Sequence, residues 1–348
     1  MILRENNTFS ARYEVLRGNA VYAEIYAVDD TPEIRNIESS VLKMTFRGIF
    51  YAYGKDVNFL SDRLRVIITI NGQDYSAGTY VITTETKTHS NGMDAVEIEG
   101  YSLLYLAHRK RLESPLYIEA GTNYITQIVQ LLNSCGIEKI EADETPYTFS
   151  NSREDWEIGT PILDIANQLL LEISYNSAWV NLEGAVRLTK YQTPDISNVS
   201  HTYSANEYSI IEDNYEITSD RFDKSNVFRI TCENPELSNS MVAISENDNP
   251  DSPFSTVNIG RILYTEQVDN IPSQDALQEY ADRLKYQSLQ ETETVEFMTA
   301  IVPTHETYDV VALENGDMAG IYTETEWWFN VTAGGSMTHK ARKVTRNA

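Results

Sequence analysis

The stretch RLRVIITINGQDYSAGTYVITTE, Arg63 to Glu85, holds the clearest structural pattern in this sequence of 348 residues. Apolar residues occupy every second position of its first part: Leu64, Val66, Ile68 and Ile70. Ile67 interrupts the alternation, but the period of two still predicts a strand with one face against a core. Asn71-Gly72 then favours a turn with positive φ, and the extended pattern resumes at Tyr80-Val81-Ile82. The stretch therefore predicts an antiparallel hairpin.

Similar strand patterns surround this hairpin over the first 112 residues. NAVYAEIYAVD and SSVLKMTFRGIF are rich in β-branched and aromatic residues, and Asn91-Gly92 precedes DAVEIEGYS, another alternating segment. Linked antiparallel hairpins at this spacing predict a small barrel or sandwich. The part ends at a basic cluster, His108 to Arg111, without interleaved aromatic residues. Such a cluster is more typical of a solvated boundary or an acid-pairing surface than of a nucleic-acid site.

Residues 113–192 change to a helical period. EAGTNYITQIVQLLNSCG and WEIGTPILDIANQLLLEIS resemble each other, which suggests an internal duplication. We expect Thr122 and Thr160 to be N-caps, with Pro161 at the first helical position, where its missing N–H costs little. Gly136 is expected to follow the end of the first helix as its C′ residue. Two short strands in SAWVNLEGAVRLTKY complete a predicted α+β module.

The last part, residues 193–348, returns to strands and contains one helix near 273–290. SQDALQEYADRLKYQSLQ has an apolar face, and Ser273 is its expected cap. Asn315-Gly316 and Gly334-Gly335 predict turns between later strands. Trp327-Trp328-Phe329 suits a buried core and a subunit interface equally well. The predicted fold class is α+β, mostly β, with two similar β-rich parts flanking a small α+β module.

The composition argues against several classes of protein. The chain has 52 acidic and 27 basic residues and a net charge of −25, so it should repel nucleic acid and anionic membranes. The start, MILRENNTFSARYEV, lacks the apolar core of a signal peptide, and no run approaches the roughly 18 apolar residues of a membrane span. Cys135 and Cys232 stand far apart, which predicts two buried, reduced thiols. We expect synthesis in the cytoplasm, no membrane insertion by the chain itself and no specific nucleic-acid binding.

A search for catalytic groups finds no recognised motif. There is no GxSxG, P-loop, HExxH or GxGxxG pattern. The histidines are scattered and none has helical spacing to another, which argues against a histidine-based metal site or nucleophile. They are His89, His108, His201, His305 and His339. Paired carboxylates are too common in so acidic a chain to identify a hydrolase. We therefore predict no enzyme activity, no cofactor, and no catalytic, cofactor-binding or metal-binding residue.

The acidic stretch ISENDNPDSPFSTVNIGR, Ile244 to Arg261, is the best candidate for a calcium loop or a catalytic carboxylate pair. A calcium loop of the EF-hand type needs glycine at its sixth position, and counting from Glu246 that position is Asp251. Asn249-Pro250 and Ser252-Pro253 break secondary structure, and no flanking helices are predicted. The stretch is therefore interpreted as an exposed acidic connector.

The order of these segments resembles one known family. NVFRITCEN, the acidic ENDNPDSPFSTVNIGR, the helix in SQDALQEYADRLKYQSLQETETVEF, YDVVALENGD and a final strand pair resemble the C-terminal half of baseplate hub proteins from contractile phage tails and phage-tail-like particles. DWEIGTPILDIANQLLLEISYNSAWVNLEGAVRLTKY is similar to the family's central segment. AEIYAVDDTPEIRNIESSVLKMTF, with the long hairpin, is similar to its first tube-like domain. The resemblance covers nearly the whole chain.

The resemblance implies a homotrimer. Each subunit would carry two tube-like β-barrel domains, residues 1–112 and 193–348, around a peripheral module, residues 113–192. Three subunits would form a pseudo-sixfold ring that joins a sixfold tail tube to a threefold spike. The implied partners are the tail tube or tube-initiator protein, the central spike protein and the surrounding baseplate wedge proteins. The implied location is the baseplate of a virion or tailocin, a bacteriocin-like particle, assembled in a bacterial host.

Two other functions remain open, a tail-associated cell-wall hydrolase and a receptor-binding adhesin. We expect no further domain after AGGSMTHKARKVTRNA, and we expect lytic and spike functions to belong to other proteins. Residues 205–255 hold 11 acidic and 3 basic residues. Our hypothesis is that acids of the β-rich parts line a central channel and repel passing DNA. Ordinary solubilising surface charge accounts for the same excess.

Overall fold

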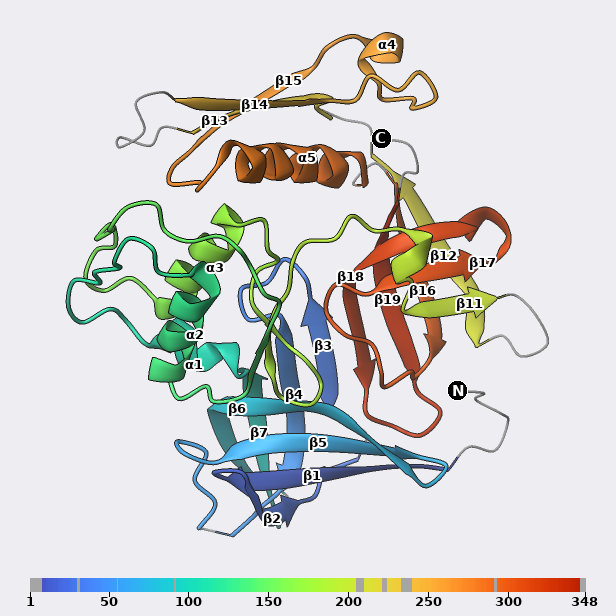
Figure 1. Ribbon diagram of the computed structural model, residues 1–348. Coiled ribbons are helices and arrows are strands. Elements are labelled where there is room, and N and C mark those ends of the chain that lie inside the picture. The colour runs from blue at the N-terminus through green and yellow to red at the C-terminus, as the bar shows by residue number, and fades with distance from the viewer. Residues whose placement is uncertain are drawn as a thin grey trace.

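The computed structural model describes residues 8–29, 32–54, 56–90, 92–204, 210–220, 224–232, 240–290 and 293–344 (Figure 1). Strands dominate these residues, and the longer helices gather in the central module and near residue 280. The predicted class, α+β and mostly β, is therefore confirmed. Among the described residues, no helix combines the length and apolar character needed to cross a membrane.

Seven strands form the first β-rich half. They are β1 (Phe9–Arg17), β2 (Ala20–Ile25), β3 (Glu33–Ile37), β4 (Met44–Tyr51), β5 (Arg63–Ile70), β6 (Gln73–Ser90) and β7 (Met93–Ser102). All seven pair, in the order β3-β4-β7-β6-β5-β1-β2. The segment after β2 then returns to β4, because Ala27 bridges Phe50 and the Val28 amide donates to the Ile49 carbonyl. This half is therefore barrel-like around an apolar core.

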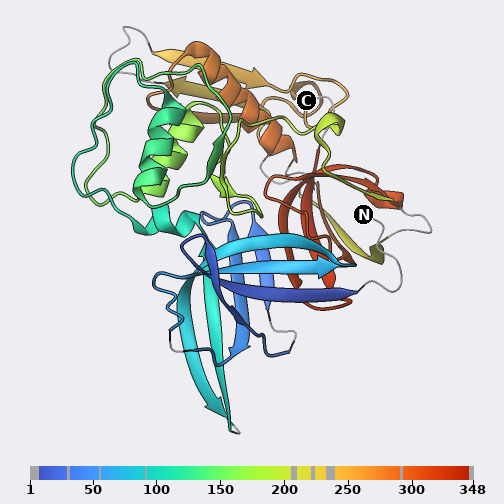
Figure 2. The ribbon, with the colours of Figure 1, turned by 60° about the horizontal axis from the view of Figure 1, so that its bottom comes forward.

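The predicted hairpin from Arg63 to Glu85 is present and extends further than its sequence pattern. The side chains of β5 alternate between half-buried and buried, with Ile67 on the half-buried face. Asn71 and Gly72 have φ of 53° and 78°, which the tight hairpin turn requires. Residues 83–90 of β6 are exposed where they pair with β7. These two strands project from the body as an arm (Figure 2).

Six strands form the second β-rich half. They are β11 (His201–Ser204), β12 (Ile211–Ser219), β16 (Glu293–Ala300), β17 (Val310–Glu314), β18 (Gly320–Asn330) and β19 (Ser336–Lys343), with the 3-10 helices η1 (Ile196–Asn198) and η2 (Gly316–Met318) nearby. They pair in the order β12-β16-β19-β18-β17-β11. Among the described residues, no pairing joins β11 to β12, so this half is open at that point.

The two β-rich halves share one 13-stranded sheet, where two separate barrels were expected. The long strand β18 makes the connection. Its first part pairs with β17, and its last part, Glu326 to Asn330, pairs with β3 from Ile37 back to Glu33. A strand edge that is not paired within its own half gains backbone hydrogen bonds in this way. The length of β18 therefore joins the halves.

The central module contains three helices and a small sheet. The helices are α1 (Leu104–Arg109), α2 (Tyr124–Ser134) and α3 (Ile162–Glu172), and the sheet has β8 (Ile140–Ala142), β10 (Val186–Leu188) and β9 (Trp179–Val180) in that order. The buried faces of the helices share one apolar core with this sheet. The module lies beside the first β-rich half (Figure 1).

The helix starts in this module lie one residue later than predicted. Asn123, not Thr122, caps α2, and its side-chain oxygen accepts from the Thr126 amide at 3.2 Å. Pro161 is the N-cap of α3, and the Thr160 hydroxyl instead donates to the Glu157 carbonyl. Both threonines lie in the approach to a helix, where a hydroxyl has local alternatives to capping. Gly136 follows α2 with φ of 80°, as predicted.

A separate unit interrupts the second β-rich half. Strands β14 (Met241–Glu246), β13 (Val227–Cys232) and β15 (Leu263–Val268) form their own sheet in that order, with α4 (Thr256–Ile259) before β15. Helix α5 (Gln274–Gln290) covers one face of this sheet (Figure 1). Its start is as predicted, because the Ser273 hydroxyl accepts from the Ala276 amide at 3.1 Å. The sequence predicted the helix but assigned the three strands to the second tube-like domain. The domain boundaries near residues 112 and 192 are a proposal.

Candidate functional site

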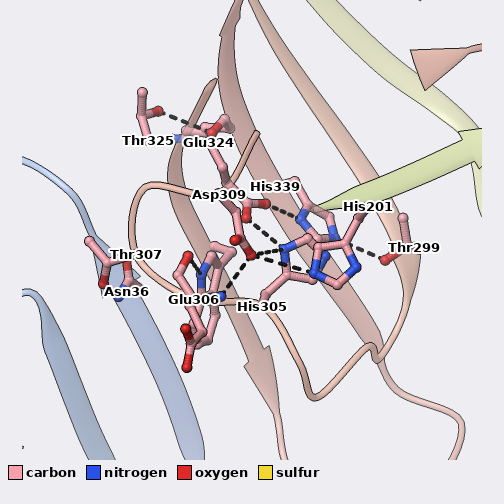
Figure 3. Close-up of polar contacts among 12 residues, drawn as sticks. Asn36, His201, Thr299, His305, Glu306, Thr307, Asp309, Glu324, Thr325 and His339 are labelled. Carbon is pink, nitrogen blue, oxygen red and sulfur yellow. Dashed lines mark hydrogen bonds and ion pairs between the residues drawn. The ribbon is translucent and has the colours of Figure 1, made fainter. Parts of the chain in front are cut away.

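Three histidines that are far apart in sequence meet in the core of the second β-rich half (Figure 3). His201 begins β11, His305 lies in the loop before β17, and His339 lies in β19. Glu324 of β18 and Asp309 complete the cluster, which we call the histidine cluster. His305, Glu324 and His339 are only 1%, 3% and 0% exposed. These three side chains are therefore removed from bulk water.

A β-bulge turns Glu324 into this core. The register between β18 and β19 shifts between Glu324 and Glu326. A bulge re-aims the side chains on either side of it. Glu326 consequently lies in a half-buried position beside Arg35, while the Glu324 backbone amide donates to the Asp309 carbonyl at 2.9 Å. The irregularity places a carboxylate where continued alternation would not.

The Glu324 carboxylate joins two histidines in one chain of hydrogen bonds. One oxygen lies 2.7 Å from Nδ1 of His305, and the other is bonded to Nδ1 of His339. At the far sides of the rings, Nε2 of His305 is bonded to the Tyr203 hydroxyl and Nε2 of His339 lies 2.9 Å from Oγ1 of Thr299. Both nitrogens of each ring therefore have a partner, as burial demands.

His201 and Asp309 extend the cluster toward its half-buried side. Asp309 Oδ2 lies 3.4 Å from Nε2 of His201 and 3.5 Å from Nδ1 of His305. The rings of His201 and His305 stack with centroids 3.9 Å apart. Asp309 also accepts from the Glu306 backbone amide at 2.8 Å, which fixes its orientation.

The pKa directions describe a core that holds one cation beside one carboxylate. Burial opposes charge on Glu324, but His305 and His339 outweigh it and lower the pKa of Glu324 to about 2. Burial also opposes charge on His305, yet the Glu324 and Asp309 carboxylates raise its pKa. For His339 burial dominates and lowers the pKa. Near pH 6.5 these directions favour an anionic Glu324, a cationic His305 and a neutral His339.

Two overlapping groups in the cluster offer metal-ligand atoms within 4.8 Å of one another, His201-His305-Asp309 and His305-Glu324-His339. Their present geometry fits a hydrogen-bonded network better than a metal site. The inward nitrogens of His305 and His339 are already bonded to Glu324. A metal bonds a ring nitrogen in the plane of the ring, whereas the His201 and His305 rings lie face to face. The hydrogen-bonded arrangement can hold a proton on a histidine, and it links β18 and β19 to the loop before β17.

No pattern in the sequence indicated this cluster. His201, His305 and His339 share no spacing that places them on one helix or strand, and each is brought in by a different strand or loop. Of the other two histidines, His89 lies near the tip of the β6–β7 arm, 2.6 Å from Asp94, and His108 lies in α1. Only the strand order of the second half decides which three meet.

The acidic stretch from Ile244 to Arg261 connects β14 to β15, and side-chain hydrogen bonds hold it in place. Asn226, which is completely buried, donates to the carbonyls of Phe254 and Gly260 and accepts from the Ile262 amide. Glu246 pairs with Arg261 at 2.5 Å. Asp248 and Asp251 are exposed, as expected for connector acids. The sequence missed the one-turn helix α4, whose cap is Ser255.

The other residues singled out in the sequence have structural positions. Cys135 and Cys232 are free thiols, half-buried and buried respectively. Trp327 and Phe329 are buried core residues at 2% and 3% exposure. Trp328 lies on the other face of β18, with the Arg35 guanidinium 5.1 Å from its ring centroid. The aromatic run is therefore mainly core.

Comparison with solved structures finds the same fold over nearly the whole chain. A tail protein from Neisseria meningitidis MC58 is 12% identical with a TM-score of 0.66, and the match covers 96% of each chain. The 43 kDa tail protein of prophage MuSo2 from Shewanella oneidensis is 11% identical with a TM-score of 0.65, covering 95% of this chain and 98% of that one.

A third similar structure comes from a secretion system. The Escherichia coli c3393 protein, a type VI secretion component described as structurally similar to the T4 tail proteins gp27 and gp5, is 9% identical with a TM-score of 0.57. The match covers 96% of this chain and 77% of that one. No protein-family model and no curated protein matches the sequence. The chain therefore has the fold of bacteriophage tail proteins.

Proposed function

We propose that this chain is a structural baseplate hub of a contractile injection machine, without enzyme activity. The observation that carries the proposal is the extent of the fold match, which covers 96% of this chain and 96% of the Neisseria tail protein. A likeness confined to one barrel would be compatible with many functions, since common folds serve many roles. A likeness over both β-rich halves and the central module argues for the same overall architecture.

The proposed assembly is a homotrimer in which each subunit contributes two tube-like domains. Seven paired strands in the first β-rich half and six in the second are consistent with two such domains per chain. Three subunits with two domains each give six positions around one axis, which matches a sixfold tube, while the trimer itself matches a threefold spike. The structural similarity of the E. coli secretion component to the T4 tail proteins gp27 and gp5 supports a place for this chain in a tail-like assembly.

The sheet ends supply edges for contacts between subunits. The strand order of the shared sheet ends at β12 on one side and at β2 on the other. Most residues of β12 and β2 are exposed. Exposed strand edges pair readily with other chains unless something covers them. In the proposed ring, these strand edges are covered by neighbouring subunits and by the tube, spike and wedge proteins. The chain is then a structural component of the assembled particle.

The acidic channel is a separate part of this proposal. The region 205–255 includes 205–209, 221–223 and 233–239, which lie outside the described residues. Within the described part, Glu212, Asp213 and Glu216 lie on β12, and the last two are exposed. Acids on this strand would face the lumen if β12 lies on the inner side of the ring. They would then repel DNA backbone phosphates.

The test is the mass of the purified full chain in solution, alone and with its spike protein. A stable trimer, or one formed only with the spike protein, supports the hub. A chain that stays monomeric with and without the spike protein overturns the hub proposal. Clearing of peptidoglycan in a zymogram would instead favour a cell-wall hydrolase. Direct binding of the isolated chain to bacterial cells would favour an adhesin.

A further inference from the structure

A pocket of about 500 Å³ lies between α5 and the central module, outside the histidine cluster. Its volume falls in the range of roughly 300–1,000 Å³ that is typical of small-molecule sites. Polar and aromatic side chains dominate its lining, including Ser174, Tyr175, Lys190, Tyr191, Arg283 and Tyr286. Neither the hub architecture nor the histidine cluster uses this pocket.

Arg283 is a desolvated cation in this pocket without an ion-pair partner among the described residues. Its Nη1 donates to the Tyr175 carbonyl at 2.7 Å, and its guanidinium lies 4.6 Å from the centroid of the Tyr191 ring. Glu279 lies one helical turn earlier but forms no ion pair with it. Burial lowers the pKa of Arg283, as expected where a charge is stabilised too little. Most of its hydrogen-bond donors remain available.

A buried lysine lies close enough to the half-buried Arg283 for the two positive charges to repel each other. Lys43 is 4% exposed. Burial lowers its pKa to about 8, with a smaller contribution from the charge of Arg283 in the same direction. Glu38 is the carboxylate that attracts both cations. Buried cations are normally compensated by anions at close range, yet among the described residues neither Lys43 nor Arg283 forms an ion pair with a carboxylate.

Two residues of the pocket lining each carry a buried hydroxyl that lacks a partner in the described part of the chain. Ser174 Oγ and Tyr191 Oη are buried and have no hydrogen-bond partner among the described residues. Ser174 has φ of 56°, a left-handed conformation that is uncommon for a residue other than glycine. Strained residues and unsatisfied buried groups tend to gather at binding sites. Both oxygens lie on residues that line the same pocket as Arg283.

We propose that this pocket binds a ligand through an oxyanion, either a carboxylate or a phosphate group. The Arg283 guanidinium neutralises the charge, and the hydroxyls of Ser174 and Tyr191 donate hydrogen bonds to the oxyanion. The tyrosine rings pack against the rest of the ligand. Two carboxylates, Glu279 and Asp282, also line the pocket. Asp282 accepts from Ser245 and Gln278 and so faces the sheet of β14, and Glu279 forms no ion pair with Arg283. The proposal does not depend on the hub function.

The test is isothermal titration calorimetry, which measures the dissociation constant of the purified full chain. The chain is titrated with inorganic phosphate and, separately, with an N-acetylated, C-amidated Gly-Glu-Gly peptide. Sodium chloride holds the ionic strength constant. Binding of either probe to wild type, weakened about tenfold or more in Arg283→Met, supports the site, since a charged hydrogen-bonding partner is lost. Binding of phosphate alone would indicate that the natural ligand is a small free anion. Binding of the peptide would indicate that it is an acidic side chain of a partner protein.

Two further variants keep the test decisive. Ser174→Gly removes the hydroxyl at a backbone conformation that glycine adopts freely, so the protein should fold and yet bind several-fold more weakly. Arg229→Met is the matched control, because Arg229 is exposed on β13 and should leave binding unchanged. The proposal fails if wild type binds neither probe. It also fails if Arg283→Met and Ser174→Gly bind as tightly as wild type.

Discussion

Glu324 and His305 form an ion pair inside the second β-rich half, with Oε2 and Nδ1 2.7 Å apart and both side chains at most 2% exposed. A buried pair of this kind contributes little net stability relative to an apolar core, but breaking it leaves an uncompensated charge. The pair therefore ties β18 to the loop before β17, and His339 ties the same carboxylate to β19.

Replacing Glu324 with Gln should destabilise the protein strongly. The amide cannot balance the charge on His305, so we expect a loss of about 3–5 kcal/mol in the free energy of unfolding. Urea denaturation followed by circular dichroism measures this loss. Glu326→Gln on the same strand is the control, because Glu326 pairs with Arg35 near solvent and should lose about 1 kcal/mol or less. Equal losses in the two variants would contradict the assigned role.

Stability should depend on pH through the same pair. The pKa of His305 is raised above 6.5 in the folded state, so its contribution is complete below pH 6.5 and disappears as pH rises through the folded value. The pKa of Glu324 is lowered from 4.5 to about 2, so its contribution is complete above pH 4.5 and disappears as pH falls toward 2. The pair should therefore stabilise most between pH 4.5 and 6.5.

The His305→Gln variant isolates this pH dependence from the rest of the chain. The difference in unfolding free energy between wild type and this variant should be largest between pH 4.5 and 6.5 and smaller at higher pH. His339 changes in the opposite sense, because its lowered pKa favours the neutral ring and its contribution declines as pH falls below 6.5. A difference that stays constant from pH 4.5 to higher pH would show that folding does not raise the pKa of His305.

Assembly should tolerate removal of the exposed acids in the loop before β15. Asp248 and Asp251 are exposed, and the contacts of Asn226 hold the loop without their charges. The double substitution Asp248→Asn with Asp251→Asn should leave the oligomeric mass and the melting temperature unchanged. Light scattering and thermal denaturation check this. Loss of oligomer in the double variant would show that the acids bind a neighbouring subunit.

Asn226→Ala should have the opposite outcome in the same loop. The substitution leaves the Ile262 amide and two carbonyls without a side-chain partner, at a cost of about 1–3 kcal/mol. Limited proteolysis should then cut between Glu246 and Ile262 before any cut appears in the β-rich halves. Wild-type resistance in Asn226→Ala would mean that the loop is held by other contacts.

The N-cap of α5 offers a local test of stability. Ser273→Ala removes the hydroxyl that accepts from the Ala276 amide, and caps of this kind contribute about 1 kcal/mol. We expect a fall of that size in the unfolding free energy. Ser273→Asp should retain wild-type stability, since aspartate caps equally well. An unchanged free energy of unfolding in Ser273→Ala would indicate that packing against β13 and β14, and not the cap, stabilises α5.

The sequence by itself determined the elements that depend on neighbours along the chain. Alternation and Asn71-Gly72 predicted the β5–β6 hairpin, and Ser273 with its apolar face predicted α5, because turn geometry, capping and side-chain period are local. The helix starts near Thr122 and Thr160 were wrong by one residue, since adjacent side chains compete for the same amides. Segments rich in β-branched and aromatic residues likewise indicated a mostly β chain.

Tertiary structure alone decided the shared sheet and the histidine cluster. The pairing of β18 with β3 joins residues almost 300 positions apart, as Trp327 with Asn36 shows. His201, His305 and His339 become neighbours only through the order of β11, β17, β18 and β19, and a bulge at Glu324 supplies their carboxylate. Such contacts depend on which strand edges meet, and a single strand's pattern carries no information about its distant partner.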